Sequence, residues 1–180
     1  AVDQLAAAAG EGPVALLTHH PLASGGPHGT RGADLAANLF PLRDLHPGLW
    51  LPLPVLGSLW VGYRDGVGTG QDLSARRYRR LREDLARAFD GRPALFQASG
   101  HDHSVQVLEA PHPAARWVLV SGAGLWPRGT AVTRRPATRY ASSRAGFLRV
   151  DLGRGGPPRL AVLEATTEGG AVGRFQTVLR

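Results

Sequence analysis

The pattern of hydrophobic and polar positions predicts strands through most of the second half of the chain. Short apolar or alternating runs there are separated by turns rich in Gly and Pro, as expected for the strands of a sheet. The expected strands cover residues 94–98, 104–109, 117–120, 147–152, 160–164 and 172–179. The last three follow one another closely, and they predict an antiparallel β meander at the end of the chain.

The first half of the chain predicts one buried strand and two helices. Residues 14–17 are a short apolar run between turn signals, which is typical of a buried strand. Residues 1–9 are helix-like, and residues 74–90 form the clearest amphipathic helix, with Ser74 as the expected N-cap. The apolar positions of this helix recur at spacings of three and four: Tyr78, Leu81, Leu85 and Phe89. Strands and helices together indicate an α/β fold class.

Residues 30–73 show no regular pattern and are expected to form an irregular loop insertion. Within them, the apolar segment 49–56 contains Pro52 and Pro54. Proline disfavours both a helix interior and a central strand, because it lacks an N–H group and its ring is bulky. We therefore expect this segment to be an ordered loop that covers the core, or a lid beside a functional site.

Composition limits the possible functions without assigning one. The 180 residues suit a single domain, with 43% hydrophobic and 19% charged residues. No apolar run approaches the roughly 18 residues that a membrane helix needs. Cysteine is absent, which excludes disulfides, thiol catalysis and cysteine-ligated metal sites. Lys, Met and Ile are absent too, so the net charge of +7 comes from Arg alone. This pattern suits a GC-rich coding sequence and does not by itself predict an anionic partner.

The arginine-rich run at residues 76–82 looks like a nucleic-acid patch, but its spacing favours a solvated helix face. Oppositely charged side chains four residues apart can pair on a helix surface. Three such pairs are expected: Arg79–Glu83, Arg80–Asp84 and Glu83–Arg87. The sequence contains no RNP, KH or zinc-finger motif, so no nucleic-acid partner is predicted.

Seven histidines occur in the chain, and four of them form two short clusters. His19 and His20 follow one predicted buried strand, and His101 and His103 follow another. In α/β sheets, functional side chains gather beyond the carboxyl ends of strands. Imidazole is a common ligand of zinc, iron and manganese, so the two clusters are candidate metal ligands. A sharp turn permitted by Gly100 would direct His101 and His103 into one cavity.

Two segments resemble the last motifs of the calcineurin-like metallophosphoesterases. Residues 100–103, Gly-His-Asp-His after a buried strand, are similar to the final ligand motif of that family. Residues 17–22, Leu-Thr-His-His-Pro-Leu, resemble the preceding motif with its single ligand histidine. The order of the motifs and the helix between them also match. Residues 99–108 and 118–124 are most similar to the purple-acid-phosphatase-like branch, and the resemblance is weakest over residues 30–73.

The resemblance implies a fold, a reaction and a cofactor. Residues 1–180 would be the C-terminal portion of a single metallophosphoesterase domain, one half of a four-layer αββα sandwich. The implied reaction is metal-dependent hydrolysis of phosphate esters at a dinuclear site. The implied cofactors are two divalent or trivalent metal ions, Fe, Zn or Mn. The acid-phosphatase branch is often exported, which favours an extracytoplasmic location.

The resemblance also implies roles for individual histidines. His19 and His101 would ligate one ion, and His103 would ligate the other. His28, nine residues after His19, would contact the substrate phosphate or assist the leaving group. Two further residues would lie behind the ligands without binding the ions: His20 and Asp102.

The chain also departs from the family. Of the motifs that supply the bridging carboxylate and most other ligands, Gly-Asp-x-x-Asp and Gly-Asn-His-Asp/Glu do not occur in the chain, and the Asp-x-His string at residues 44–46 lacks the family's context. The missing half of the domain is therefore expected to precede Ala1. Residues 1–180 alone are expected to bind metal weakly or not at all, and to lack turnover. Ser104 replaces an Asn that is frequent in the relatives, and His46 and His112 match no motif and are expected on the surface.

Two other interpretations remain open. A non-catalytic β-module can hold a metal or another ligand through His-x-His, as cupin-like folds do, and residues 1–180 would then contain the whole site. An Arg-rich interaction protein would instead bind polyanions in a salt-sensitive way. Within the phosphoesterase interpretation, the sequence does not choose between monoesters, diesters, nucleotides and phospholipids.

Overall fold

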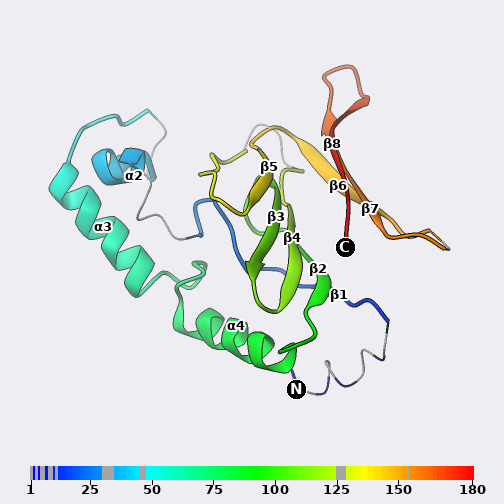
Figure 1. The fold of residues 1–180 in the computed structure, drawn as a ribbon. Coiled ribbons are helices and arrows are strands. Elements are labelled where there is room, and N and C mark those ends of the chain that lie inside the picture. The colour runs from blue at the N-terminus through cyan, green and yellow to red at the C-terminus, as the bar shows by residue number, and fades with distance from the viewer. Residues whose placement is uncertain are drawn as a thin grey trace.

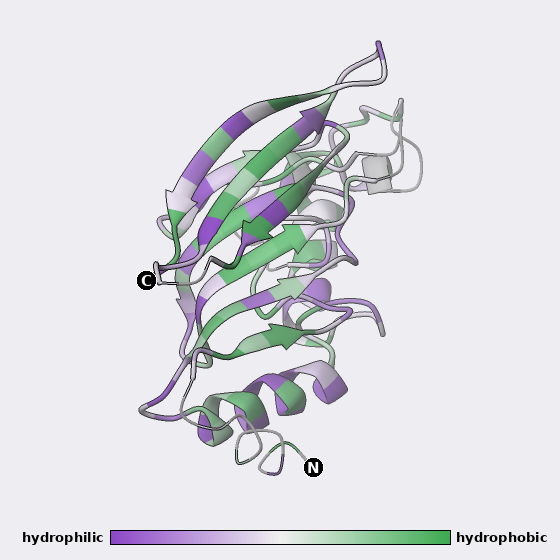
Figure 2. Ribbon diagram, turned by 90° about the vertical axis from the view of Figure 1, so that its right-hand side faces the viewer, coloured by the Kyte–Doolittle hydropathy of each residue, from purple (hydrophilic) through white to green (hydrophobic). Residues whose placement is uncertain are grey.

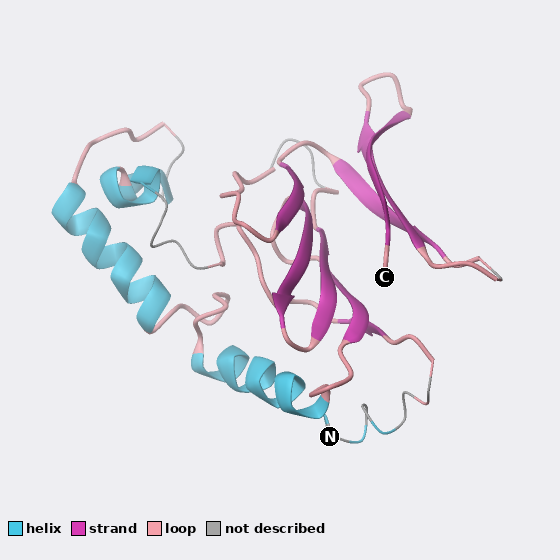
Figure 3. Cartoon of the chain, in the orientation of Figure 1, coloured by secondary structure: helices cyan, strands magenta, loops and turns pink. Residues whose placement is uncertain are grey.

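The computed structural model describes residues 2, 4, 7, 10, 12–29, 35–44, 48–124, 129–153 and 155–180. It has a mixed α/β architecture with two sheets (Figure 1), which confirms the expected fold class at that level. The helical elements are α2 (Leu35–Leu39), the 3-10 turn η1 (Pro41–Asp44), α3 (Pro54–Gly66) and α4 (Arg76–Ala88). The strands are β1 (Ala15–Leu17), β2 (Ala94–Ser99), β3 (Val105–His112), β4 (Ala115–Ser121), β5 (Thr138–Ser142), β6 (Gly146–Asp151), β7 (Arg159–Ala165) and β8 (Ala171–Val178). Figure 3 shows α2 and α3 to one side of the strands and α4 below the larger sheet.

The larger sheet brings together strands that are distant in the sequence. Its order is β1-β2-β4-β3-β5. β2 is parallel to both β1 and β4, whereas β3 is antiparallel to β4 and β5. Because β1 and β2 are parallel neighbours, with Leu17 opposite Ala98, they end at the same edge of the sheet. The loops that follow these two strands therefore emerge side by side.

Two hydrophobic cores hold three layers together. On one face of the larger sheet, Leu85 of α4 and Phe89, which follows the helix, pack in a cluster with Val118 of β4. On the other face, Phe96 and Trp117 pack against the antiparallel sheet β6-β7-β8. Figure 2 shows hydrophobic segments running along the strands. The described residues thus form three layers: a helix, a mixed sheet and an antiparallel sheet.

The strand predictions are largely confirmed in position, but the expected burial of the first strand is wrong, because Ala15 and Leu17 of β1 are exposed. Each of the six expected strands of the second half is present, and β6, β7 and β8 form the expected antiparallel meander. The sequence analysis missed β5, whose residues Thr138–Ser142 carry polar side chains and no alternating apolar pattern. Of the predicted helix over residues 1–9, the described residues Val2, Gln4 and Ala7 are helical, and the others lie outside the described residues.

Helix α4 confirms the predicted amphipathic helix, but its start and its surface differ from expectation. Ala75 occupies the N-cap position without a side-chain cap, while the Ser74 hydroxyl donates a hydrogen bond to the Arg64 carbonyl. The ion pair recorded on this described helix is Arg87–Asp84, at a spacing of three rather than four. The three expected i,i+4 pairs do not form there, so more of the arginine face is solvated.

The expected irregular insertion is wrong for part of residues 30–73, because α2, η1 and α3 lie within it. Pro54 starts α3, where a proline is tolerated because the first helical N–H needs no intrahelical partner. Leu49, Trp50 and Leu51 remain exposed, so this segment does not cover the core as expected. Residues 30–34 and 45–47 of the insertion lie outside the described residues.

His112 is buried at the end of β3, which corrects the expectation that it lies on the surface. Its Nδ1 accepts a hydrogen bond from the Ala114 backbone N–H at 3.2 Å. Burial, together with the nearby Arg82 guanidinium, lowers the pKa of His112 to about 4.

His46, the other histidine expected on the surface, lies outside the described residues. In the described part of the chain, no helix is both long enough and apolar enough to cross a membrane.

Candidate metal site

The loops after β1 and β2 carry the two histidine clusters. The parallel pairing continues one residue beyond β1, where the Thr18 N–H donates to the Ala98 carbonyl at 3.1 Å. His19 and His20 follow directly in the loop after β1, and His101 lies in the loop after β2. Residues that are about 80 positions apart in the sequence therefore meet at one edge of the sheet.

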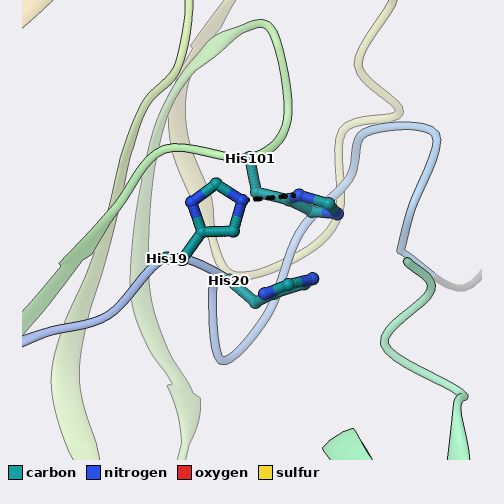
Figure 4. A group of neighbouring side chains, drawn as sticks. All are labelled: His19, His20 and His101. Carbon is teal, nitrogen blue, oxygen red and sulfur yellow. Dashed lines mark hydrogen bonds between the residues drawn. The ribbon is translucent and has the colours of Figure 1, made fainter. Parts of the chain in front are cut away.

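Three imidazoles from these loops form a compact group, here called the imidazole group: His19, His20 and His101. One nitrogen from each ring lies within 4.8 Å of those of the other two (Figure 4). His101 Nδ1 is 3.3 Å from His19 Nε2, and the His20 ring centroid is 3.9 Å from that of His101. His101 Nε2 lies 2.9 Å from the carbonyl oxygen of Gln71, to which it donates. The resemblance assigns two of these residues as ligands, and in the structure the His20 ring lies beside them.

The backbone of His101 itself takes the left-handed conformation in this turn. Its φ is +59°, whereas Gly100 is not among the described glycines with positive φ, so the expectation of a turn through Gly100 is corrected. A non-glycine residue in this region costs about 1–3 kcal/mol, and such residues cluster at functional sites. The following turn is closed by the Ser104 N–H, which donates to the Asp102 carbonyl at 2.7 Å. The chain thus holds the His101 ring in position at a local energetic cost.

His103 and His28 line the same pocket as His19 and His101, but they are not members of the imidazole group. The pocket has a volume of about 530 Å³. Its described lining residues are His19, His28, Gln71, Gly100, His101, His103, Ser121, Gly122 and Gly124. The His28 ring centroid is 4.4 Å from that of His101. The described lining includes no carboxylate, so the walls offer imidazole, amide, hydroxyl and backbone groups.

His28 is joined to a buried ion pair that the sequence analysis did not identify. Its Nδ1 lies 3.3 Å from Oδ1 of Asp72, which is 2% exposed. Arg64 donates to both oxygens of this carboxylate, and Thr69 donates to it through its N–H and its hydroxyl. Burial opposes ionisation of Asp72, but the Arg64 and Thr69 hydrogen bonds outweigh it and lower the pKa to about 2. His28 therefore faces a permanent negative charge.

Asp102 lies behind the site and holds the His28 loop. Its side chain is buried and accepts hydrogen bonds from the Ser24 hydroxyl and from the His28 backbone N–H, the latter at 3.3 Å. A Cβ atom on Gly26 would lie only 2.7–2.9 Å from this carboxylate, so the close approach requires glycine. Asp102 thereby fixes the loop 24–28 against the turn that carries His101.

Two buried glutamines support the loops from inside the sheet, and the sequence analysis missed both. Gln97 of β2 accepts from the Leu22 N–H at 3.1 Å and donates to the Thr18 hydroxyl at 2.6 Å. Gln106 of β3 accepts from the Gly25 N–H and donates to the Ser104 hydroxyl, each at 2.9 Å. The signal that could have found them was a single Gln in each of two otherwise mostly apolar strands, because a buried polar side chain needs partners.

Two rings of the imidazole group, those of His20 and His101, favour the neutral form. Burial lowers the pKa of both His20 and His101, and the repulsion between neighbouring histidines lowers it further. For His101, the hydrogen bond to the Gln71 carbonyl acts in the opposite direction. Neutral imidazoles keep a free lone pair, which is the form that binds metal ions.

No protein-family model matches this chain and no curated protein matches it, so the assignment of a function rests on its residues and their geometry.

Proposed function

We propose that this protein takes part in metal-dependent hydrolysis of phosphate esters, with the histidines of this chain forming the imidazole side of a dinuclear metal site. The observation that carries the proposal is the convergence of His19 and His101. These two residues, which resemble ligands of one ion in the calcineurin-like metallophosphoesterases, lie 3.3 Å apart, nitrogen to nitrogen, at a pocket that His103 and His28 also line.

The imidazoles of this chain are suitable ligands for one part of a dinuclear metal site. Imidazoles suit Zn, Fe and Mn, and a ligand histidine commonly donates its second ring N–H to a backbone carbonyl, as His101 does to Gln71. The described pocket walls include no carboxylate to bridge two ions. The dinuclear proposal therefore includes carboxylate ligands from outside residues 1–180, which the resemblance assigns to a segment preceding Ala1.

The same proposal includes the fourth layer of the sandwich. The three described layers, α4 and the two sheets, would be three of the four layers of an αββα arrangement. A further helical layer would pack on the outer face of the antiparallel sheet, where Phe147 remains 48% exposed. Covering such apolar surface would stabilise the assembled domain by about 25 cal/mol for each Å² buried.

The protein groups around the pocket have separate roles in this proposal. When bound, the ions supply Lewis acidity toward the phosphoryl oxygens and the attacking water. His28 contacts the substrate phosphate or the leaving oxygen, and Asp72 holds its ring by the Nδ1 contact. Asp102 fixes the His28 backbone. His103 lines the same pocket and is the proposed ligand of the second ion.

A second candidate function is supported by His20. Because His19, His20 and His101 all come from this chain, a single metal ion can be held without any additional segment. A protein of this kind would bind a metal without hydrolysing phosphate esters. It corresponds to the non-catalytic metal-binding module left open by the sequence.

The deciding experiment measures hydrolysis of an aryl phosphate by residues 1–180, by a protein extended upstream of Ala1, and by the extended protein carrying His101→Ala and His103→Ala. Metal-dependent hydrolysis by the extended protein, abolished in the double variant, is the expected result. Hydrolysis that persists in the double variant, or an extended protein that binds metal but has no activity, would remove the phosphoesterase proposal.

A further inference from the structure

We infer that His19, His20 and His101 form a self-contained site for one transition-metal ion, with His20 rather than His103 as the third protein ligand. The inference deepens the proposed function and rests on the same pocket. It differs from the expectation drawn from the sequence, in which His20 only supports the ligands and residues 1–180 bind metal weakly or not at all.

The spacing of the nitrogens fits a tetrahedral ion. Two nitrogens bound to Zn²⁺ at about 2.0–2.1 Å with tetrahedral angles lie about 3.3 Å apart. His19 Nε2 and His101 Nδ1 are separated by 3.3 Å, and the nitrogens of all three rings fall within 4.8 Å (Figure 4). The pair already has the separation that coordination requires, and the separations of the third nitrogen from the other two would have to shorten by at most about 1.5 Å.

The hydrogen bond of His101 determines which of its two ring nitrogens could bind a metal ion. Its Nε2 faces the Gln71 carbonyl at 2.9 Å and must carry the proton, because a carbonyl oxygen only accepts. In the neutral ring, Nδ1 then has the lone pair, and Nδ1 is the atom that faces His19. A backbone carbonyl that orients a histidine in this way is a regular feature of metal sites.

His20 is held beside the other two rings by its surroundings. Its carbonyl accepts a hydrogen bond from the Thr18 hydroxyl at 2.6 Å, and its ring lies against Tyr78 on α4, with centroids 5.0 Å apart. The Tyr78 hydroxyl in turn donates to the Pro21 carbonyl at 2.6 Å, which ties α4 to this loop. The turn after β1 therefore presents two consecutive imidazoles to His101, whereas His103 is absent from the described group.

The chemistry of the three ligands specifies the class of ion. Three neutral imidazoles suit Zn²⁺, Co²⁺, Ni²⁺ or Cu²⁺ and are poor ligands for Mg²⁺ and Ca²⁺, which prefer oxygen. His19 is exposed and the other two rings are partly exposed, so a fourth position remains open to solvent and to the pocket. Three protein ligands with one open position is the arrangement typical of catalytic rather than structural zinc.

Titration of chelator-treated residues 1–180 with Zn²⁺, followed by calorimetry, tests this inference, and Co²⁺ absorption reports the coordination geometry. We expect one Zn²⁺ per chain and a tetrahedral Co²⁺ spectrum. His20→Ala and the polar variant His20→Gln should weaken binding more than about 100-fold, beyond the loss of a merely supporting partner. The matched control His103→Ala should bind within a few-fold of the wild type, and amide NMR spectra would confirm that each variant is folded.

The inference is overturned if the wild-type chain takes up no stoichiometric Zn²⁺, if the His20 variants bind normally, or if His103→Ala loses binding as they do. These results are independent of hydrolysis by the extended protein. Zinc binding that depends on His20, without any hydrolysis, would leave this site in place and remove the phosphoesterase proposal. Hydrolysis by the extended protein that depends on His103, together with normal Zn²⁺ binding in His20→Ala, would overturn this site and leave the phosphoesterase proposal in place.

Discussion

Two buried carboxylates of this protein have similar partners but different surroundings. Asp72, beside the pocket, receives hydrogen bonds from Arg64 and Thr69 and contacts the His28 ring. Glu164, on β7, receives hydrogen bonds from three residues of the neighbouring strands: Tyr140 at 2.8 Å, Ser142 at 2.7 Å and Arg174 at 2.9 Å. In both cases burial opposes ionisation, and the hydrogen bonds overcome it and lower the pKa.

The difference lies in what else each carboxylate reaches. Glu164 joins β5 to β7 and β8, so its contacts connect the two sheets. Asp72 connects α3 to the segment before α4, and its remaining contact is a titratable ring at the pocket. Its arginine is also more deeply buried, since the Arg64 side chain is 10% exposed and that of Arg174 is 45% exposed. The partly exposed ion pair at Glu164 thus connects strands, whereas the buried pair at Asp72 also contacts the His28 ring at the pocket.

The largest expected effect follows from Asp72→Asn. This change keeps the shape of the side chain but removes the charge that faces Arg64 in a buried environment. We expect the free energy of unfolding to fall by about 3–5 kcal/mol, the usual cost of losing one partner of a buried pair. Urea denaturation at pH 7 measures it. A loss below about 1 kcal/mol would show that solvent screens this pair as it does a surface pair.

Lowering the pH should test the comparison, because the fold is expected to lose stability through a buried histidine before either carboxylate is protonated. The pKa of His112 is about 4 in the folded chain, against an ordinary value of 6.5 for histidine, so the unfolded chain binds more protons between these values. Stability is therefore fully present above pH 6.5 and is lost as the pH falls toward 4. At about 1.4 kcal/mol for each pKa unit, the loss approaches about 3 kcal/mol.

Urea denaturation across this pH range, compared between the wild type and His112→Gln, checks the assignment. The variant should show a flatter profile between pH 6.5 and 4. Below pH 3.8, Asp72 should add a second loss as the pH approaches its folded pKa of about 2. Parallel profiles of the two proteins above pH 4 would mean that His112 is not the group that titrates.

The fold was more predictable from the sequence than the site was, and particular residues explain why. Strands such as β4, Ala115–Ser121, have apolar runs bounded by turns, and local pattern is sufficient to predict them. Helix α3 was missed because Pro52 and Pro54 weighed against a helix, although a proline at its first turn is compatible with one. Strand β5 has no apolar alternation and forms because β3 offers it a partner.

Within the site, sequence motifs identified the histidines but not the residues that orient them. Gln71 acts through its backbone carbonyl, which no side-chain motif can reveal. Asp72 meets His28 only because the Leu73 N–H donates to the His28 carbonyl at 2.8 Å, a contact across 45 residues. The left-handed backbone of His101 likewise depends on the tertiary surroundings rather than on the preceding glycine. The sequence therefore predicted the histidines of the candidate site, but not the residues distant in the sequence that position them.

Glu164→Gln should have a smaller effect than Asp72→Asn. The amide oxygen can keep the hydrogen bonds from the Tyr140 and Ser142 hydroxyls, which both go to Oε1, and loses only the one from Arg174 to Oε2. Both arginines near Glu164 are also largely exposed to water. We expect the free energy of unfolding to fall by about 1–2 kcal/mol, in the range for a buried hydrogen bond to a charged group. Thermal or urea denaturation measures it. A loss equal to that of Asp72→Asn would abolish the contrast between the two regions.

The smallest expected effect on stability follows from His28→Gln. The contact between His28 and Asp72 is long, at 3.3 Å, and the His28 side chain is 23% exposed. The carboxylate keeps its hydrogen bonds from Arg64 and Thr69 in this variant, so urea denaturation should show a change in the free energy of unfolding of less than about 1 kcal/mol. If the free energy falls by as much as in Asp72→Asn, the imidazole belongs to the structural network. A small change instead means that the fold does not require this ring, because Arg64 and Thr69 alone hold the buried carboxylate in place.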